Sequence, residues 1–187
     1  DHQFRKVIED GLRLDHISAH RHTYIIPAIF EIVCKLCKKY KINSIRFLHE
    51  PFYLTGSISK NISPFLNSNI IKFALANYFS KQNKAILNKY NLKTTDAFYG
   101  VLYTDAMNFE TIKSALDDAK KRRFKAIEIL IHPAYKDPKD KKYTSRVVEN
   151  YVKSKSREIE TTAIQSKKMK DLLSSAGIEL STFGRID

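Results

Sequence analysis

The sequence of 187 residues has few cysteines, glycines and prolines and no long apolar run. Its two cysteines are too few for a disulfide framework and favour a reducing compartment, so we expect a cytoplasmic protein. Five glycines and five prolines exclude collagen-like and low-complexity chains. No apolar run reaches the roughly 18 residues of a membrane-spanning helix, so we expect no membrane span. What remains is an ordinary globular composition in a chain long enough for one domain.

The net charge of +13 is the most unusual property of the composition. A basic chain can bind nucleic acid, because lysine and arginine neutralise phosphates. However, only nine of the 33 basic residues are arginine, the side chain that best recognises bases and phosphates. The lysines are spread along the whole chain. We therefore expect a lysine-rich surface and no nucleic-acid partner.

Several catalytic and binding motifs are also missing. The sequence contains no G-x-G-x-x-G, P-loop or G-x-S-x-G pattern, which disfavours nucleotide binding and serine hydrolysis. Cys34 and Cys37 form a C-x-x-C pair inside a predicted helix, without a second pair, so we interpret them as core or helix-surface residues. The first residue is Asp1 rather than methionine, which predicts a chain that is processed or trimmed at its front.

Hydrophobic periodicity predicts strands that alternate with helices. The predicted strands are Leu12–His20, Ser44–Leu48, Ala97–Tyr103, Ala126–Ile131 and Ile178–Phe183. The predicted helices are Ala28–Tyr40, Pro64–Tyr90, Phe109–Arg122, Tyr143–Tyr151, Ser156–Thr162 and Lys167–Ala176, with a charged loop at Lys136–Lys142. Residues typical of helix ends stand at four of these boundaries: Pro27, Asn108, Ser166 and Gly177.

This alternation predicts an α/β fold with a parallel sheet. Five strands are too few for a closed eight-stranded barrel, which typically takes about 250 residues. The alternatives are therefore a small open sheet or the later part of a barrel.

A histidine-rich segment is the first candidate site. His16, Ser18, His20 and His22 occupy alternate positions, so on a strand they would project from one face. Neutral imidazole binds divalent metals well, and the segment ends just before a helix, where parallel α/β folds place their sites. The pattern favours a metal or catalytic site over a polar strand of structural histidines.

His132 is the second candidate, because it follows an apolar strand and can act as a general acid near neutral pH. Glu128 lies on the same predicted strand face, where it can orient a histidine or face a basic neighbour. Two other pairs of charged residues have simpler interpretations. Arg46 and Glu50 flank His49 and are expected to form a surface ion pair, and Arg157 and Glu160 a helical salt bridge.

Residues His16 to Pro27 read H-I-S-A-H-R-H-T-Y-I-I-P, which resembles the H-x-D-S-H-x-H-x-H-x-x-P signature of the YdjC-like carbohydrate deacetylases. That family includes chitooligosaccharide deacetylase and hopanoid-biosynthesis deacetylase. The similarity continues, in matching order and spacing, through Phe30–Val33, Ala97–Gly100, Glu128–Tyr135, Arg157–Glu160 and Ser175–Leu180.

The resemblance implies a (β/α) barrel-like fold of the NodB/YdjC type. Residues 1–187 would form a single domain that covers its later five strands, or its C-terminal two-thirds. It also implies hydrolysis of the acetamide of an N-acetylated sugar with a divalent metal ion, magnesium or zinc. In this chain His20 would be a metal ligand and His132 the acid or oxyanion partner. His16, His22 and Arg46 would face the substrate.

The chain also departs from the family pattern. Ser18 stands where the family has Asp, and Tyr24 where it has its last His. The A-D-D-F-G segment and a later His, which would bring a catalytic base and further metal ligands, are not in the sequence. We therefore expect the chain to be inactive alone and to self-associate as a homo-oligomer through an exposed sheet edge. The alternative is a non-catalytic sugar- or partner-binding module.

Overall fold

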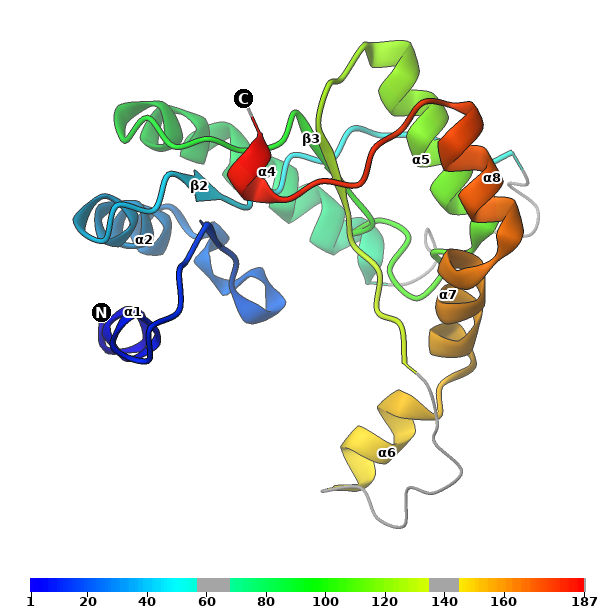
Figure 1. Cartoon of the computed structure of the whole chain (residues 1–187), viewed down its shortest axis with the longest axis horizontal. Coiled ribbons are helices and arrows are strands. Elements are labelled where there is room, and N and C mark those ends of the chain that lie inside the picture. Colours follow the sequence, from blue (N-terminus) through cyan, green and yellow to red (C-terminus); the bar gives the residue numbers. More distant parts are fainter. Residues whose placement is uncertain (57–67, 135–144, 187) are drawn as a thin grey trace.

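The structure is a computed structural model that describes residues 1–56, 68–134 and 145–186. Its helices are α1 (His2–Glu9), α2 (Pro27–Lys39), α4 (Asn69–Lys89), α5 (Phe109–Arg122), α6 (Arg146–Val152), α7 (Lys155–Gln165) and α8 (Lys167–Ser175). Its strands are β1 (His16–Ile17), β2 (Ser44–Ile45), β3 (Ala97–Tyr99) and β4 (Ile127–Ile129), and its 3-10 helices are η1 (His20–Ile25) and η3 (Phe183–Arg185). Helices follow strands along the chain, as Figure 1 shows, which confirms the predicted mixed α/β class.

The strands form two small parallel sheets. β1 pairs with β2, and β3 pairs with β4. A backbone hydrogen bond from Phe98 N–H to His49 C=O, 2.9 Å long, joins the segment after β2 to β3. The strands therefore lie side by side in chain order, with their carboxyl ends at one edge. A closed barrel stays a prediction.

All five strands were predicted too long. Those expected over Ser44–Leu48, Ala97–Tyr103 and Ala126–Ile131 are the shorter β2, β3 and β4, and the other two differ more. The first was expected over Leu12–His20, but it pairs only at His16–Ile17, because the chain then turns into η1. The last was expected over Ile178–Phe183, but within the described residues this stretch has no strand partner, and Leu180 is 80% exposed. It runs back from α8 and is held near β2, where Ser44 Oγ donates to the Phe183 C=O at 3.4 Å.

The predicted helix ends follow from local hydrogen bonds. Asn108 Oδ1 accepts the N–H of Thr111 at 3.0 Å, and Ser166 Oγ accepts the N–H of Met169 at 3.1 Å. Gly177, with φ of +63°, follows α8 as a C-terminal glycine should. The starts of two predicted helices, Pro64 and Tyr143, and the predicted loop Lys136–Lys142 lie outside the described residues, as does Tyr135.

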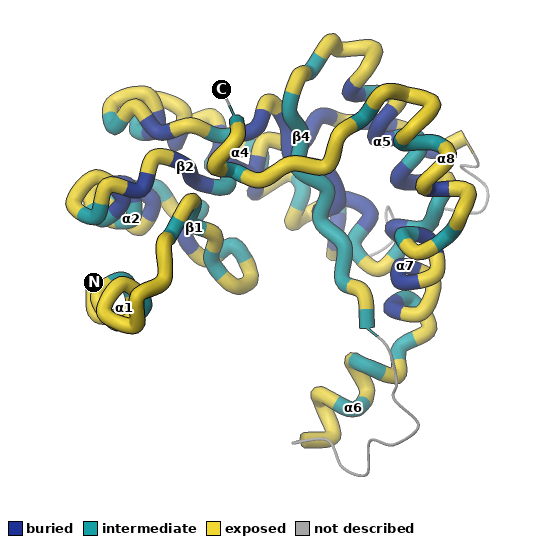
Figure 2. Tube along the Cα trace, viewed as in Figure 1, coloured by how far each residue is buried: buried dark blue, intermediate teal, exposed yellow. Residues whose placement is uncertain are grey.

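The core consists of two hydrophobic clusters, seen as the dark segments in Figure 2. The first joins α2 and α4 to the β1–β2 sheet through residues that include Phe30, Cys34, Cys37, Ile45 and Leu87. The second joins α5, α7 and α8 to β3 through residues that include Tyr99, Leu102, Ala115, Ala163 and Met169. Cys34 and Cys37 are unpaired and wholly buried, so of the two expected places, core or helix surface, they occupy the core.

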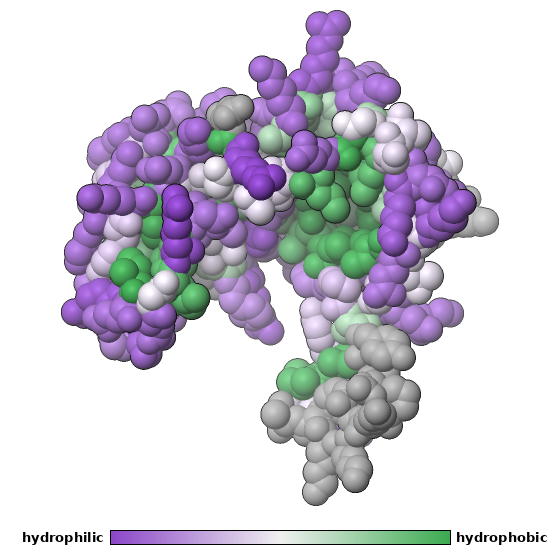
Figure 3. Space-filling model, in the orientation of Figure 1, coloured by the Kyte–Doolittle hydropathy of each residue, from purple (hydrophilic) through white to green (hydrophobic). Residues whose placement is uncertain are grey.

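One helix stands apart from this core. α6 projects from the body of the molecule (Figure 1) and has no buried residue. It exposes Val147, Val148 and Tyr151, and Figure 3 shows a small hydrophobic area over this helix. Within the described residues, no helix is long and apolar enough to cross a membrane.

Candidate active site

The three histidines of the first segment do not share one face. His16 lies in β1, but His20 and His22 lie in η1, where Arg21 and His22 both have φ of +54°. This left-handed backbone is uncommon for residues other than glycine, and it breaks the alternation that a strand would impose. The prediction of a one-faced histidine row was therefore wrong.

Each histidine has a different environment. His16 places its Nδ1 2.7 Å from Asp15 Oδ1 and stacks on Phe183, with 4.2 Å between ring centroids. His20 is exposed. His22 is half-buried, with its ring edge-on to Phe98 at 5.6 Å.

His22 is held as a neutral imidazole. Burial lowers its pKa to about 4, and the charges of Arg46, His132 and His20 act in the same direction. Its Nδ1 is buried and has no hydrogen-bond partner among the described residues. A neutral ring with a free nitrogen is the form of histidine that accepts a proton or binds a metal.

Arg46 forms an ion pair with Glu128 across the two sheets. Arg46 Nε donates to Glu128 Oε1 at 2.7 Å, Nη2 donates to the same oxygen, and the guanidinium lies 5.4 Å from the ring centroid of Phe98. The two side chains are 19% and 15% exposed. The predicted surface pair of Arg46 with Glu50 was therefore wrong, and of the two possibilities for Glu128, the basic neighbour is confirmed.

Tyr24, which stands at the family's last histidine position, supports Arg46 from the other side. Its side chain is buried, and its hydroxyl donates to the Arg46 C=O at 2.6 Å. This bond ties η1 to the segment after β2, so that His22 and Arg46 stay together.

Glu50 points into the core. Its carboxylate accepts the backbone N–H groups of Gly100, Val101 and Leu102 at 2.6, 3.1 and 3.0 Å. Burial raises the pKa of Glu50 to about 7, and the three N–H donors oppose that rise. The side chain thus fixes the turn after β3, and a surface role for it is excluded.

His132 lies beyond the end of β4 and is half-buried. Burial lowers its pKa, Arg157 lowers it further, and Glu160 opposes both effects. Its backbone N–H donates to Glu160 Oε2 at 2.5 Å, and its Nδ1 is buried without a partner among the described residues. The charge of Arg46 lowers the pKa of both His22 and His132.

The sequence pointed to Arg157 and Glu160 as a helical pair, but it did not reveal that both residues are buried. Their predicted helical ion pair is present at 3.8 Å, but the residues are only 6% and 0% exposed. A surface salt bridge and a buried ion pair have the same three-residue spacing on a helix. Only the burial of this face of α7 distinguishes them. The apolar residue Ala163 on the same helix was the available signal that this face is buried.

Metal-binding side chains do not come together in the described part of the chain. No three His, Cys, Asp or Glu residues there form a group that could hold a metal ion. The side chain of His20, the predicted ligand, is exposed. The described residues therefore do not fit a complete metal centre by themselves.

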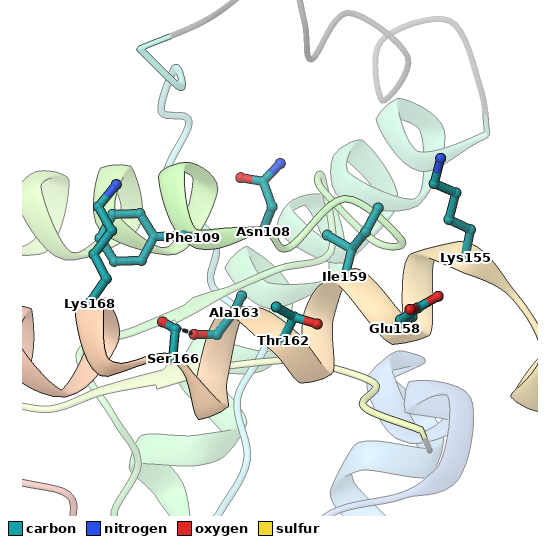
Figure 4. Close-up of a pocket in the computed structure, with 9 residues that line it drawn as sticks. All are labelled: Asn108, Phe109, Lys155, Glu158, Ile159, Thr162, Ala163, Ser166 and Lys168. Carbon is teal, nitrogen blue, oxygen red and sulfur yellow. Dashed lines mark hydrogen bonds between the residues drawn. The ribbon is translucent and has the colours of Figure 1, made fainter. Parts of the chain in front are cut away.

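Two cavities lie away from these histidines. One of about 430 Å³ lies between α5, α7 and α8, where Asn108, Phe109, Ile159 and Lys168 line it (Figure 4). Another of about 530 Å³ lies along α7 and includes Ala134 and Gln165. Neither includes His22, Arg46 or His132.

Comparison with known proteins places these features in a wider context. The YdjC-like protein family matches residues 1–175 of the chain. A carbohydrate deacetylase of Brevibacillus brevis is 24% identical over 98% of this chain and 58% of its own length. A carbohydrate deacetylase of Listeria monocytogenes serotype 4a is 23% identical over 97% of this chain and 55% of its own length.

A solved structure is similar as well. It comes from Enterococcus faecalis V583 and is described as a candidate cellobiose-phosphate cleavage protein. Its TM-score to this chain is 0.64 at 20% sequence identity, and the match covers 97% of this chain and 56% of the other. This likeness supports the fold. The chain spans a little over half the length of the relatives it matches.

Proposed function

The chain belongs to the YdjC-like protein family, and on that basis we propose that it takes part in removing the acetyl group from an N-acetylated sugar. The observation that carries this proposal is the site itself. His22 and Arg46 both contact the ring of Phe98, Arg46 is paired with Glu128, and the Nδ1 atoms of His22 and His132 are buried without a partner among the described residues. The naming of two similar proteins as carbohydrate deacetylases supports the reaction class.

The reaction adds water to the acetyl carbon and breaks the C–N bond, which yields acetate and the sugar amine. His132, as a neutral imidazole, donates a hydrogen bond to the carbonyl oxygen as negative charge develops there. The proton that the base takes from water passes to His132, which delivers it to the leaving nitrogen and returns to its neutral form. His22 and Arg46 face the substrate, and His16 contributes less directly because Asp15 and Phe183 hold it.

A carboxylate that takes the proton of water is harder to assign. Glu128 is engaged by Arg46, while Glu50 and Glu160 accept backbone N–H groups. We propose that this base comes from another part of the natural protein, together with the ligands that would complete a divalent metal site around His20. Magnesium and zinc are the two candidate ions.

The test is acetate release from N-acetylglucosamine oligomers in the presence of magnesium, zinc or manganese. The protein expressed from its complete natural reading frame should turn over, and His132→Ala should lower the rate about 100-fold. His2→Ala, at an exposed residue of α1, is the matched control and should leave the rate unchanged. The 187-residue chain should be inactive alone.

Two results would contradict this proposal in different ways. No acetate release by the complete protein would refute the deacetylase function. Turnover above about 1 per second by the 187-residue chain would refute the need for a base from elsewhere. The engaged carboxylates also favour a second candidate, a sugar-binding module without catalysis. Oligomer binding without acetate release would support it.

A further inference from the structure

The backbone of His132 is held by side chains from one face of α7. Glu160 Oε2 accepts the His132 N–H at 2.5 Å, and Arg157 Nη1 donates to the His132 C=O at 3.4 Å. Thr161 Oγ1 accepts the N–H of Ala134, two residues after His132, at 3.1 Å. We call Arg157, Glu160 and Thr161 the α7 clamp. Their spacing of three and four residues places them on the same helix face.

The α7 clamp acts where the sheet no longer holds the chain. β4 ends at Ile129, and the last backbone bond to its neighbour runs from Leu130 N–H to Tyr99 C=O at 2.8 Å. Beyond it, buried backbone groups need other partners. The clamp supplies them at alternate residues, as a neighbouring strand would.

The clamp residues are themselves restrained. Arg157 Nη2 lies 2.6 Å from Asp105 Oδ1, and its guanidinium lies 4.2 Å from the ring centroid of Tyr151. Glu160 has no exposed surface. Because burial and these contacts hold both side chains in one geometry, the His132 peptide has a fixed position.

Glu160 lowers the stability of the fold through one of its buried carboxylate oxygens. Its Oε1 is buried without a hydrogen-bond partner among the described residues, and an uncompensated buried carboxylate oxygen is destabilising. Apolar side chains of similar volume often replace buried ion pairs without loss of stability. A charged residue at this place is therefore better explained by its effect on His132 than by stability.

We propose that Arg157 and Glu160 are positioning residues for His132, which fix its peptide and set the charge around its ring. The effect of these residues on catalysis rests on the proposed function, whereas their effect on the position of His132 does not. Glu160 and Asp105 favour the protonated ring, whereas Arg157 and Arg46 disfavour it. Glu128 neutralises Arg46, and His22 is the neighbouring imidazole.

The direct test is NMR of the 187-residue chain with 13C-labelled histidine and 15N-labelled backbone. In Glu160→Gln the pKa of His132 should fall by about half a unit or more, because a nearby negative charge is lost. The His132 amide proton should also shift, since its acceptor is no longer charged. Arg157→Lys keeps the charge but loses the forked contact, so it should move the amide signal with little change in pKa.

Glu158→Gln is the matched control, because Glu158 is an exposed carboxylate on the same helix. It should change neither signal. If the His132 signals of Glu160→Gln and Arg157→Lys coincide with those of the unmodified chain, the proposal is overturned. Should Glu160→Gln fail to fold, the amide shift in Arg157→Lys decides the question.

Activity provides the second measurement, on the protein from its complete reading frame. Glu160→Gln and Arg157→Lys should each lower kcat about tenfold, the range known for residues that orient a catalytic group, while KM changes little. Unchanged kcat in both variants would overturn the catalytic consequence. If the NMR signals move as expected but the unmodified protein releases no acetate, the positioning stands and the proposed function fails.

Discussion

Replacing Gly100 with alanine should destabilise the chain far more than the same change at other glycines. Gly100 has φ of +115°, and an added Cβ would lie 2.6 Å from the Leu130 carbonyl oxygen and 3.2 Å from the Leu130 Cβ. The backbone on both sides is held. Leu130 N–H bonds to Tyr99 C=O, and Gly100 N–H bonds to Glu50. Neither segment can move away without breaking one of these bonds.

The expected cost has two parts. A positive φ for a residue other than glycine costs about 1–3 kcal/mol. Overpacking against backbone costs typically about 1–3 kcal/mol more. The total of about 2–6 kcal/mol is a large fraction of the stability of an ordinary domain, which is about 5–15 kcal/mol. Because Leu130 lies two residues before His132, the same displacement should disturb the candidate site.

Two control glycines separate these contributions. Gly177 has φ of +63° but nothing within 4 Å of its would-be Cβ, so Gly177→Ala reports backbone strain alone. Gly56 also has open space and no positive φ, so Gly56→Ala should be nearly neutral. Urea unfolding, followed by circular dichroism, gives the free energy of unfolding for each variant. If Gly100→Ala lowers the free energy of unfolding no more than Gly177→Ala does, the contact with Leu130 does not explain the need for glycine at position 100.

Two further predictions concern buried charges. Arg46→Met alone should lower the free energy of unfolding by about 3–5 kcal/mol, because it leaves Glu128 unpaired. Adding Glu128→Gln should recover part of that loss. A coupling energy near zero in the double-mutant cycle of unfolding free energies would contradict this prediction. Because the pKa of Glu50 rises to about 7 on folding, its contribution to stability is fully present below pH 4.5 and falls as pH rises to 7, by about 3 kcal/mol. Glu50→Gln should lack this decline when the free energy of unfolding is measured at pH 4.5 and pH 7.5. If the contribution of Glu50 to stability instead grows with pH, the backbone N–H donors affect its pKa more than burial does.

The sequence by itself determined the features that depend on near neighbours. Asn108 and Ser166 cap helices through bonds to N–H groups three residues away, and the alternation of strands and helices predicted the α/β class. The lack of a second cysteine pair indicated that Cys34 and Cys37 are core or helix-surface residues and form no metal site. The signature around His20 and His22 indicated the family, because a motif is a local pattern.

Only the tertiary structure decided which charges meet. Glu128 is 82 residues from Arg46, Glu50 is 50 residues from Gly100, and Glu160 is 28 residues from His132. No periodicity encodes such pairs, because each depends on how whole elements pack. The backbone of His22 is a second case, since its positive φ reflects the turn into α2 and not a preference of histidine. The three histidines that the sequence placed on one strand face thus lie in three separate environments, and His22 shares the ring of Phe98 with Arg46.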